Sequence, residues 1–135
     1  MSSLQNKAKD LGIGERTHFI GRREDVPSLL ASSYACVLTS KAEGFSNAII
    51  EYMAAGKPVV ATRVGGAAEA VIENESGYLV ESGDAAAMAE RLVDLLNDHA
   101  MAKAFGEAGK KRARSLFSRE GQLRKTIELY HSLLS

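Results

Sequence analysis

Short apolar or β-branched runs alternate with segments of helical spacing along this chain of 135 residues. Runs with strand character lie at residues 17–20, 35–39, 58–62 and 78–80. Between them, apolar residues recur three and four positions apart, which is the spacing of an amphipathic helix. Strands separated by helices pair in parallel through right-handed crossovers and carry helices on both faces of the sheet. The alternation therefore predicts an α/β, Rossmann-like, three-layer domain with a parallel sheet of about four strands.

Capping and stop signals predict where the helices lie. We expect helices at residues 2–12, 22–33, 46–55 and 67–72, and a long helix that begins at Asp84. Ser46 can cap the third of these helices, and Gly56 can end it. The helical pattern then continues to the end of the chain in two pieces, with Gly121 near their junction. The length fits one domain over residues 1–135, with residues 99–135 as a carboxyl-terminal helical segment.

Composition excludes several classes of protein. Charged residues make up 25% and hydrophobic residues 45% of the chain, as in ordinary folded, water-soluble domains, so disordered and disulfide-framework proteins are excluded. No apolar run approaches the roughly 20 residues that span a membrane. The amino-terminal residues are polar and unlike a secretory signal, and the single cysteine, Cys36, fits a small buried residue. These features predict a cytoplasmic protein.

The charge is balanced overall but uneven along the chain. Seventeen basic and seventeen acidic side chains give a net charge of zero, which argues against a nucleic-acid partner. Residues 103–125 nevertheless hold eight bases and two acids. This basic segment is either a solvated helix face or a patch for an anionic partner such as lipid. Peripheral attachment at the inner membrane face therefore stays open as an alternative.

The loop at residues 40–47 is the main candidate for a binding site. Ligands of open α/β sheets bind beyond the carboxyl ends of the strands, and a helix start offers unpaired amides that suit a phosphate or diphosphate. Gly44 lets the backbone approach such a group. Glu43 lies before the expected helix and Glu51 inside it, and each carboxylate can accept two hydrogen bonds from sugar hydroxyls. The alternative that both are solvated surface charges is left open by the spacing alone.

Six segments in order carry a resemblance to a known family. Residues 43–51 resemble the Glu-x7-Glu signature of retaining glycosyltransferases of family 4 (GT4), which have the two-domain GT-B fold. The flanking segments at residues 18–21, 36–40, 52–62, 65–69 and 77–80 are similar to the family in the same order. The resemblance covers nearly the whole chain. It implies that residues 1–135 are part of the carboxyl-terminal, nucleotide-sugar-binding domain of such an enzyme.

The resemblance also implies roles for individual residues. Glu43 would be the catalytic-site residue that holds hydroxyls of the donor sugar. The amides of residues 44–47 would meet the sugar and the diphosphate, which makes substrate-binding residues of Gly44, Phe45, Ser46 and Asn47. Glu51 would bind the ribose, and Gly21 and Arg22 would lie near the base. The family needs no essential metal, so we expect no cofactor beyond the donor substrate itself.

The reaction that the resemblance implies is transfer of a sugar from a nucleoside-diphosphate sugar to an acceptor hydroxyl, in polysaccharide or glycolipid synthesis. The family's amino-terminal domain, which supplies the acceptor site, and a basic Arg and Lys pair that clamps the diphosphate would precede residue 1. We therefore expect residues 1–135 alone to be inactive and to need that domain as a partner. The alternative is a non-catalytic module that binds nucleotide sugars or takes part in other interactions.

The resemblance has a consequence for the sheet. In the family's usual strand order, two further strands would lie in the sheet between the strand at residues 17–20 and the strand at residues 35–39. Either these two strands pair directly, or another chain completes the edge, because unpaired strand edges invite pairing. We expect the isolated chain to be marginally stable, self-associating through its incomplete sheet, or locally rearranged.

Overall fold

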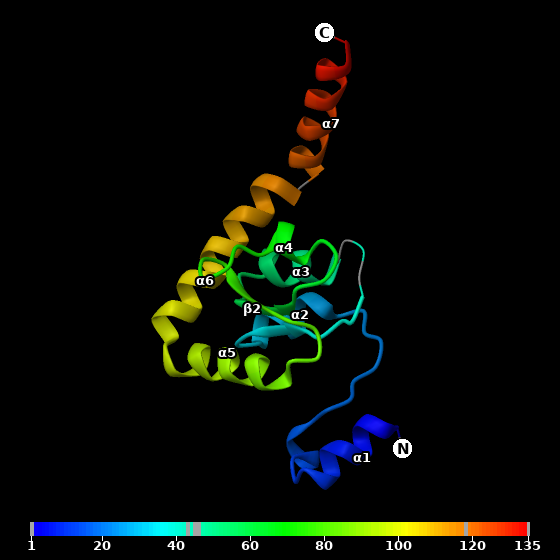
Figure 1. Cartoon of the computed structure of the whole chain (residues 1–135), viewed down its shortest axis with the longest axis vertical. Helices are drawn as coiled ribbons and strands as arrows, with labels where there is room; N and C mark the ends of the chain where they lie inside the picture. The colour runs from blue at the N-terminus through cyan, green and yellow to red at the C-terminus, as the bar shows by residue number, and fades with distance from the viewer. Residues whose placement is uncertain (1, 43, 45–46, 118, 135) are drawn as a thin grey trace.

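A sheet of three parallel strands lies at the centre of the computed structural model, which describes residues 2–42, 44, 47–117 and 119–134 (Figure 1). The strands are β1 (Cys36–Leu38), β2 (Val59–Thr62) and β3 (Gly77–Val80), in the order β1-β2-β3. All four residues of β2 and of β3 are buried, because both faces of the sheet are covered by helices. The predicted α/β class and parallel pairing are confirmed.

Helices connect the strands and continue to the end of the chain. They are α1 (Ser3–Asp10), α2 (Val26–Ser32), α3 (Asn47–Ala54), α4 (Ala67–Ala70), α5 (Ala85–Asn97), α6 (His99–Arg112) and α7 (Arg119–Leu134), with a 3-10 turn η1 (Gly14–Arg16) and a π-helical turn η2 (Ala113–Phe117). The carboxylate of Asp84 caps α5 by accepting from the amide of Ala87, as its place in the sequence predicts. The last two helices meet at η2 rather than at Gly121, which lies inside α7.

Alternating strand residues build one core on each face of the sheet. On one face, residues of β2 and β3 pack with α3 and α4; the buried members of this cluster are Ile49, Met53, Val59, Ala61, Ala67, Ala70, Val71, Leu79 and Ala113. On the other face, residues of the same strands pack with α5 and α6; the buried members are Val60, Tyr78, Val80, Met88, Leu95, Ala102 and Phe105. The structure is therefore three-layered; α6 contributes to the second core, and Ala113, the first residue of η2, contributes to the first.

Two glycines allow α6 to approach the sheet closely. A Cβ on Gly106 would lie 2.1 Å from the carbonyl oxygen of Gly56, and a Cβ on Gly109 would meet the side chain of Met53 at 3.6 Å. The first distance is far shorter than real contacts allow, so only glycine fits at position 106. This close approach holds α6 against the turn between α3 and β2.

The predicted strand at residues 17–20 is wrong. These residues form no strand, and the side chains of Phe19 and Ile20 are 47% and 51% exposed. A strand needs a neighbour for its backbone groups, and within the described residues β1 pairs only with β2. The sheet thus has three strands rather than about four, direct pairing of residues 17–20 with β1 does not occur, and the outer edge of β1 has no strand beside it there.

The two ends of the chain project from the body in opposite directions. Figure 1 shows α1 below the sheet, joined to α2 by an extended stretch, and α7 above it. The capping box of α1 is complete, since Ser2 and Gln5 exchange side chain to backbone hydrogen bonds. Across the residues that the structure describes, every helix is too short or too polar to cross a lipid bilayer.

Candidate functional site

The loops after β1 and β2 are tied together at the carboxyl edge of the sheet. The hydroxyl of Thr62, at the end of β2, donates to the carbonyl oxygen of Ser40 at 2.6 Å. The amide of Gly66 donates to the carbonyl oxygen of Gly44 at 2.9 Å. Both bonds cross between segments that are distant in sequence, so they tie Ser40 and Gly44 to the end of β2 and the loop after it.

Two residues of the predicted diphosphate-binding segment, Gly44 and Asn47, are described by the structure. Gly44 is exposed, and a Cβ built on it would meet nothing within 4 Å, so open space adjoins the backbone here. Asn47 is the first residue of α3 and is exposed. The first amides of a helix have no intrahelical partners and carry partial positive charge, which favours an anion. Three other predicted residues, Glu43, Phe45 and Ser46, lie outside the described residues.

Glu51 lies one turn further along α3, beside a hollow between α2 and α3. The hollow has a volume of about 560 Å³, and Glu51 is its acidic lining residue; the others are Val26, Pro27, Leu30, Ala31, Ala54 and Ala55. Residues four apart lie on the same helix face, so Glu51 and Asn47 share a face of α3. An apolar hollow with one carboxylate fits a ligand that combines a ring with hydroxyl groups.

Gly21 and Arg22 lie in the extended stretch before α2, and both are exposed. Gly21 has a φ of +61°, a conformation in which a side chain would be strained. This turn directs the chain toward α2, whose first two residues line the hollow beside Glu51. Asn47 and Glu51 therefore lie on one face of α3. Gly21 and Arg22 do not line the hollow themselves; they precede α2, which does.

Sequence reasoning missed a second pocket, on the α5 face of the same sheet edge. It has a volume of about 290 Å³ and collects residues at or just after the ends of all three strands. Its lining comprises Thr39, Lys41, Thr62, Glu81, Gly83, Asp84, Ala85, Met88, Ala89 and Leu92. Its lining combines apolar residues of α5 with one basic and two acidic side chains. The rule that ligands bind beyond the strand ends predicts a site at this edge of the sheet. The helical periodicity of α5 does not predict that the helix forms one wall of a pocket there.

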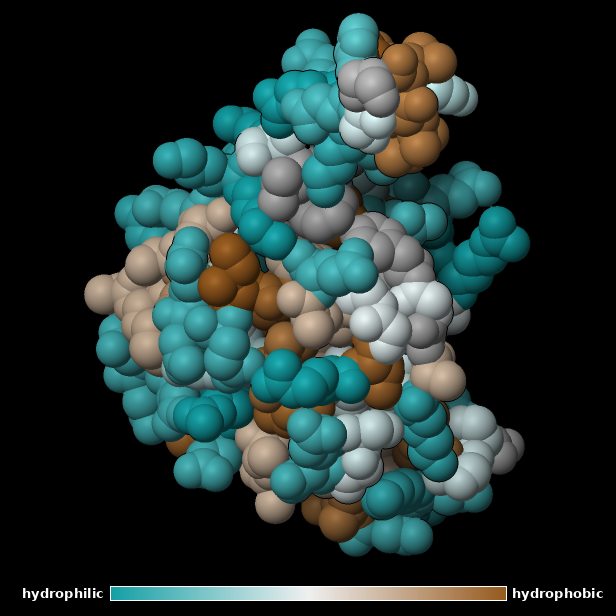
Figure 2. Space-filling view, turned by 45° about the horizontal axis from the view of Figure 1, so that its top comes forward, coloured by the Kyte–Doolittle hydropathy of each residue, from teal (hydrophilic) through white to brown (hydrophobic). Residues whose placement is uncertain are grey.

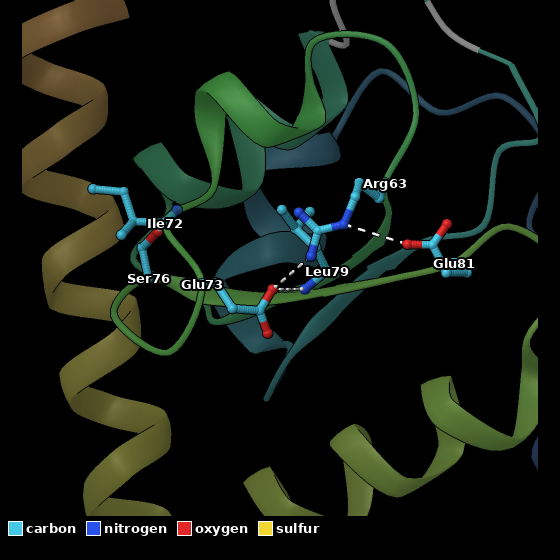
Figure 3. A network of polar contacts seen from close by, with 6 residues as sticks. All are labelled: Arg63, Ile72, Glu73, Ser76, Leu79 and Glu81. Carbon is cyan, nitrogen blue, oxygen red and sulfur yellow. Dashed lines mark hydrogen bonds and ion pairs between the residues drawn. The ribbon is translucent and has the colours of Figure 1, made fainter.

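A polar network fixes the end of β3 (Figure 3). The amide of Leu79 donates to Oε2 of Glu73 at 2.9 Å, and the same oxygen lies 3.5 Å from the guanidinium of Arg63. Nε of Arg63 lies 3.5 Å from a carboxylate oxygen of Glu81. Arg63 therefore faces two carboxylates, from Glu73 and Glu81, which lie before and after β3 in the sequence.

Burial and neighbouring charges shift three pKa values in the body. Burial raises the pKa of the Cys36 thiol, so Cys36 is the inert buried residue that the sequence predicts. The pKa of Tyr52 is raised chiefly by burial and further by Cys36 and the Glu51 carboxylate. The pKa of Tyr78 is raised chiefly by burial. Within the described residues, no group of three or more His, Cys, Asp or Glu side chains is arranged to hold a metal ion.

Comparison with known proteins identifies a matching family. Residues 2–112 match the family described as glycosyl transferases group 1. N-Acetyl-α-D-glucosaminyl L-malate synthase of Bacillus anthracis is 33% identical over 126 residues, which are 93% of this chain and 33% of that protein. Further relatives are named for capsular polysaccharide and lipopolysaccharide core biosynthesis. This chain spans about a third of the length of the curated relatives that it matches first.

Two solved structures resemble the fold. HepE of Anabaena, in a structure with bound UDP, is 30% identical with a TM-score of 0.87, covering 96% of this chain and 36% of that one. The carboxyl-terminal domain of a group 1 glycosyl transferase, LpcC of Francisella tularensis, is 27% identical with a TM-score of 0.76, covering 86% of this chain and 61% of that one. The fold is thus that of a GT-B glycosyltransferase carboxyl-terminal domain.

Proposed function

The chain belongs to the glycosyl transferases group 1 family, and we propose that it is the donor-binding part of a retaining glycosyltransferase of family 4. Such an enzyme transfers a sugar from a nucleoside-diphosphate sugar to an acceptor hydroxyl. The names of relatives in capsular polysaccharide and lipopolysaccharide core biosynthesis support a role in polysaccharide or glycolipid synthesis.

One observation carries the proposal. The first residue of α3 is exposed at the carboxyl edge of the sheet, and Glu51 lies one turn further along the same helix, beside an apolar hollow. The first amides of α3 favour an anion, and the carboxylate of Glu51 can accept hydrogen bonds from two neighbouring hydroxyls. A nucleoside diphosphate carries both an anionic diphosphate and the two neighbouring hydroxyls of its ribose, a few ångströms apart. HepE, which has a similar fold, binds UDP in one structure and UDP-glucose in another.

We assign roles within this proposal by position. The amides of residues 44–47 bind the diphosphate and the donor sugar, and Glu43 accepts hydrogen bonds from that sugar's hydroxyls. Glu51 binds the ribose. Gly21 and Arg22, which precede α2, lie near the base in this proposal. The helix start supplies positive charge to the departing diphosphate, so the proposal includes no essential metal ion. A chelator is expected to leave nucleotide binding unchanged.

The acceptor site belongs, in this proposal, to an amino-terminal domain that acts as the partner of this chain. The bond between the anomeric carbon and the diphosphate oxygen breaks, a bond to the acceptor oxygen forms, and the acceptor proton leaves with the diphosphate. A module that only binds nucleotide sugars would bind equally well but show no transfer when a group 1 amino-terminal domain is supplied. Transfer under that condition separates the two functions.

Thermal unfolding with and without nucleotide tests donor binding. A ligand at ten times its dissociation constant adds about 1.4 kcal/mol to the free energy of unfolding, which raises the midpoint by several degrees in a domain of this size. We expect UDP, GDP or ADP to produce such a shift in the native chain and a much smaller one in Glu51→Ala.

Glu128→Ala is the matched control, because Glu128 is an exposed carboxylate on α7, away from the hollow. It should show the full shift. Absence of a shift with every nucleotide, or an equal shift in Glu51→Ala, would overturn the assignment.

A further inference from the structure

The pocket of about 290 Å³ between α5 and the strand ends, which we call the α5 pocket, has an apolar wall. Four lining residues on α5 are spaced by three, four and seven positions from the first of them, so they share one face of the helix: Ala85, Met88, Ala89 and Leu92. Figure 2 shows hydrophobic groups scattered among hydrophilic side chains on the face of the molecule that it presents. Apolar surface alone therefore does not single out a binding site, and the charges beside the wall decide what the α5 pocket can bind.

Both acidic residues of the α5 pocket already have partners within the chain. A carboxylate oxygen of Asp84 accepts a hydrogen bond of 2.9 Å from the amide of Ala87, in the first turn of α5. A carboxylate oxygen of Glu81 lies 3.5 Å from Nε of Arg63, and Figure 3 shows these two side chains pointing toward each other. The partial positive charge at the start of α5 and the guanidinium of Arg63 therefore offset the two negative charges.

The basic residue of the lining, Lys41, has no such partner. Lys41 is exposed, and across the part of the chain that the structure describes, no hydrogen bond or ion pair involves its ammonium group. It follows β1 in the loop that continues to Gly44. The ammonium is thus the charge of the α5 pocket that is available to a ligand. An ammonium forms strong, charge-assisted hydrogen bonds with an anion such as a carboxylate.

We propose that the α5 pocket binds a small carboxylate that carries an apolar body, such as a ring on a short arm. The carboxylate pairs with Lys41, while the apolar body lies against Met88 and Leu92. A volume of about 290 Å³ is at the lower end for small-molecule pockets, about 300–1,000 Å³, so the body is the size of one ring. An amine would face carboxylates that already have partners, and a phosphate would leave the apolar wall uncovered. This inference does not depend on nucleotide binding, because the proposed donor site includes none of these three residues.

Titration of the full nitrogen-15-labelled chain with four matched probes tests the proposal. Phenylacetate has both groups, acetate lacks the ring, phenethyl alcohol lacks the charge, and phenethylamine reverses it. We expect phenylacetate to shift the amide resonances of Lys41, Gly83 and Ala85 saturably, and to bind at least about tenfold more tightly than the other three probes. Equal or tighter binding of phenethylamine would overturn the proposal, since the carboxylates would then select the ligand. So would equal binding of acetate or phenethyl alcohol, or the absence of a saturable shift with phenylacetate.

Two variants of the lining locate the ligand. Lys41→Met removes the charge but keeps an unbranched side chain, and Ala89→Phe fills part of the α5 pocket; each should bind phenylacetate about tenfold more weakly. Lys103→Met and Ala104→Phe are the matched controls, because both residues are exposed on α6 and neither lines the α5 pocket. These controls should bind as the native chain does. Thermal unfolding shows that the variants keep their fold, which is expected because every changed residue is exposed. Unchanged binding in Lys41→Met or in Ala89→Phe, or an equal loss in the controls, would overturn the proposal.

Discussion

The amide of Gly66 donates a hydrogen bond of 2.9 Å to the carbonyl oxygen of Gly44, which joins the loop after β2 to the loop before α3. Gly44 belongs to the proposed diphosphate-binding segment, whereas Gly66 precedes α4. The position of Gly44 therefore depends on a segment that has no contact with the ligand in this proposal. A pre-positioned loop loses less conformational freedom when the ligand binds.

Removing this amide should weaken nucleotide binding. Gly66 has a φ of −79°, which proline can adopt, so Gly66→Pro deletes the donor without forcing the backbone angle at position 66. We expect a loss of about 1 kcal/mol in the free energy of unfolding and a several-fold weaker nucleotide affinity. Isothermal titration and denaturant unfolding measure the two effects. Gly66→Ala keeps the amide and should bind normally; equal losses in both variants would show that the bond is unimportant.

The close approach of α6 to Gly56 predicts a large stability effect at position 106. In Gly106→Ala the new Cβ would lie 2.1 Å from the Gly56 carbonyl oxygen, so the helix must move away from the turn. We expect a loss of about 3 kcal/mol in the free energy of unfolding, measured with urea. Gly44→Ala, whose Cβ would meet nothing within 4 Å, should change stability little. Similar values for the two variants would contradict the packing described here.

The two carboxylates that face Arg63 should contribute unequally to stability. Glu73 accepts the Leu79 amide as well as pairing with Arg63, so Glu73→Ala leaves a strand amide without its partner. This change should cost about 1–2 kcal/mol. Glu81 makes only an exposed ion pair at 3.5 Å, and Glu81→Ala should cost less than about 0.5 kcal/mol. Chemical unfolding distinguishes these values, and a larger effect for Glu81→Ala would reverse the assignment.

The buried thiol of Cys36 should make stability fall at high pH. Burial raises its pKa in the folded state above the ordinary value of 9.0, so the unfolded chain loses this proton first. The stabilisation is complete below pH 9.0 and is lost progressively as the pH rises toward the folded-state pKa. Melting midpoints between pH 7 and pH 10 should therefore fall more in the native chain than in Cys36→Ala. Identical profiles would show that the thiol ionises freely in the folded protein.

The sequence predicts most of this fold because the strands and helices that form are supported by local signals. β2 is a β-branched run that starts after Pro58, and Asp84 caps α5 as expected. Residues 17–20 have equally good strand character, yet a strand forms only where a neighbour pairs with it. The local sequence pattern contains no information about whether such a neighbouring strand is present, so the prediction of a strand at residues 17–20 was wrong.

The candidate site divides in the same way. The order of Gly44 before α3, Asn47 at its start and Glu51 one turn further along it follows from spacing along one loop and one helix. The pocket under α5, the bond from Gly66 to Gly44 and the network around Glu73 join segments far apart in sequence. Such contacts depend on how the loops meet in space, which no periodicity encodes. The roles assigned to Gly44, Asn47, Glu51, Gly21 and Arg22 stay predictions. So do those of Glu43, Phe45 and Ser46, which lie outside the described residues.

The most direct test of the central claim is a nitrogen-15 amide spectrum of the labelled chain, titrated with UDP, GDP and ADP in turn. Donor binding at the start of α3 predicts that one nucleotide moves the amide resonances of Gly44, Asn47 and Glu51, while those of α1 and α7 stay in place. Resonances of α3 that do not move with any nucleotide, or movement confined to the basic end of α6, would contradict the account.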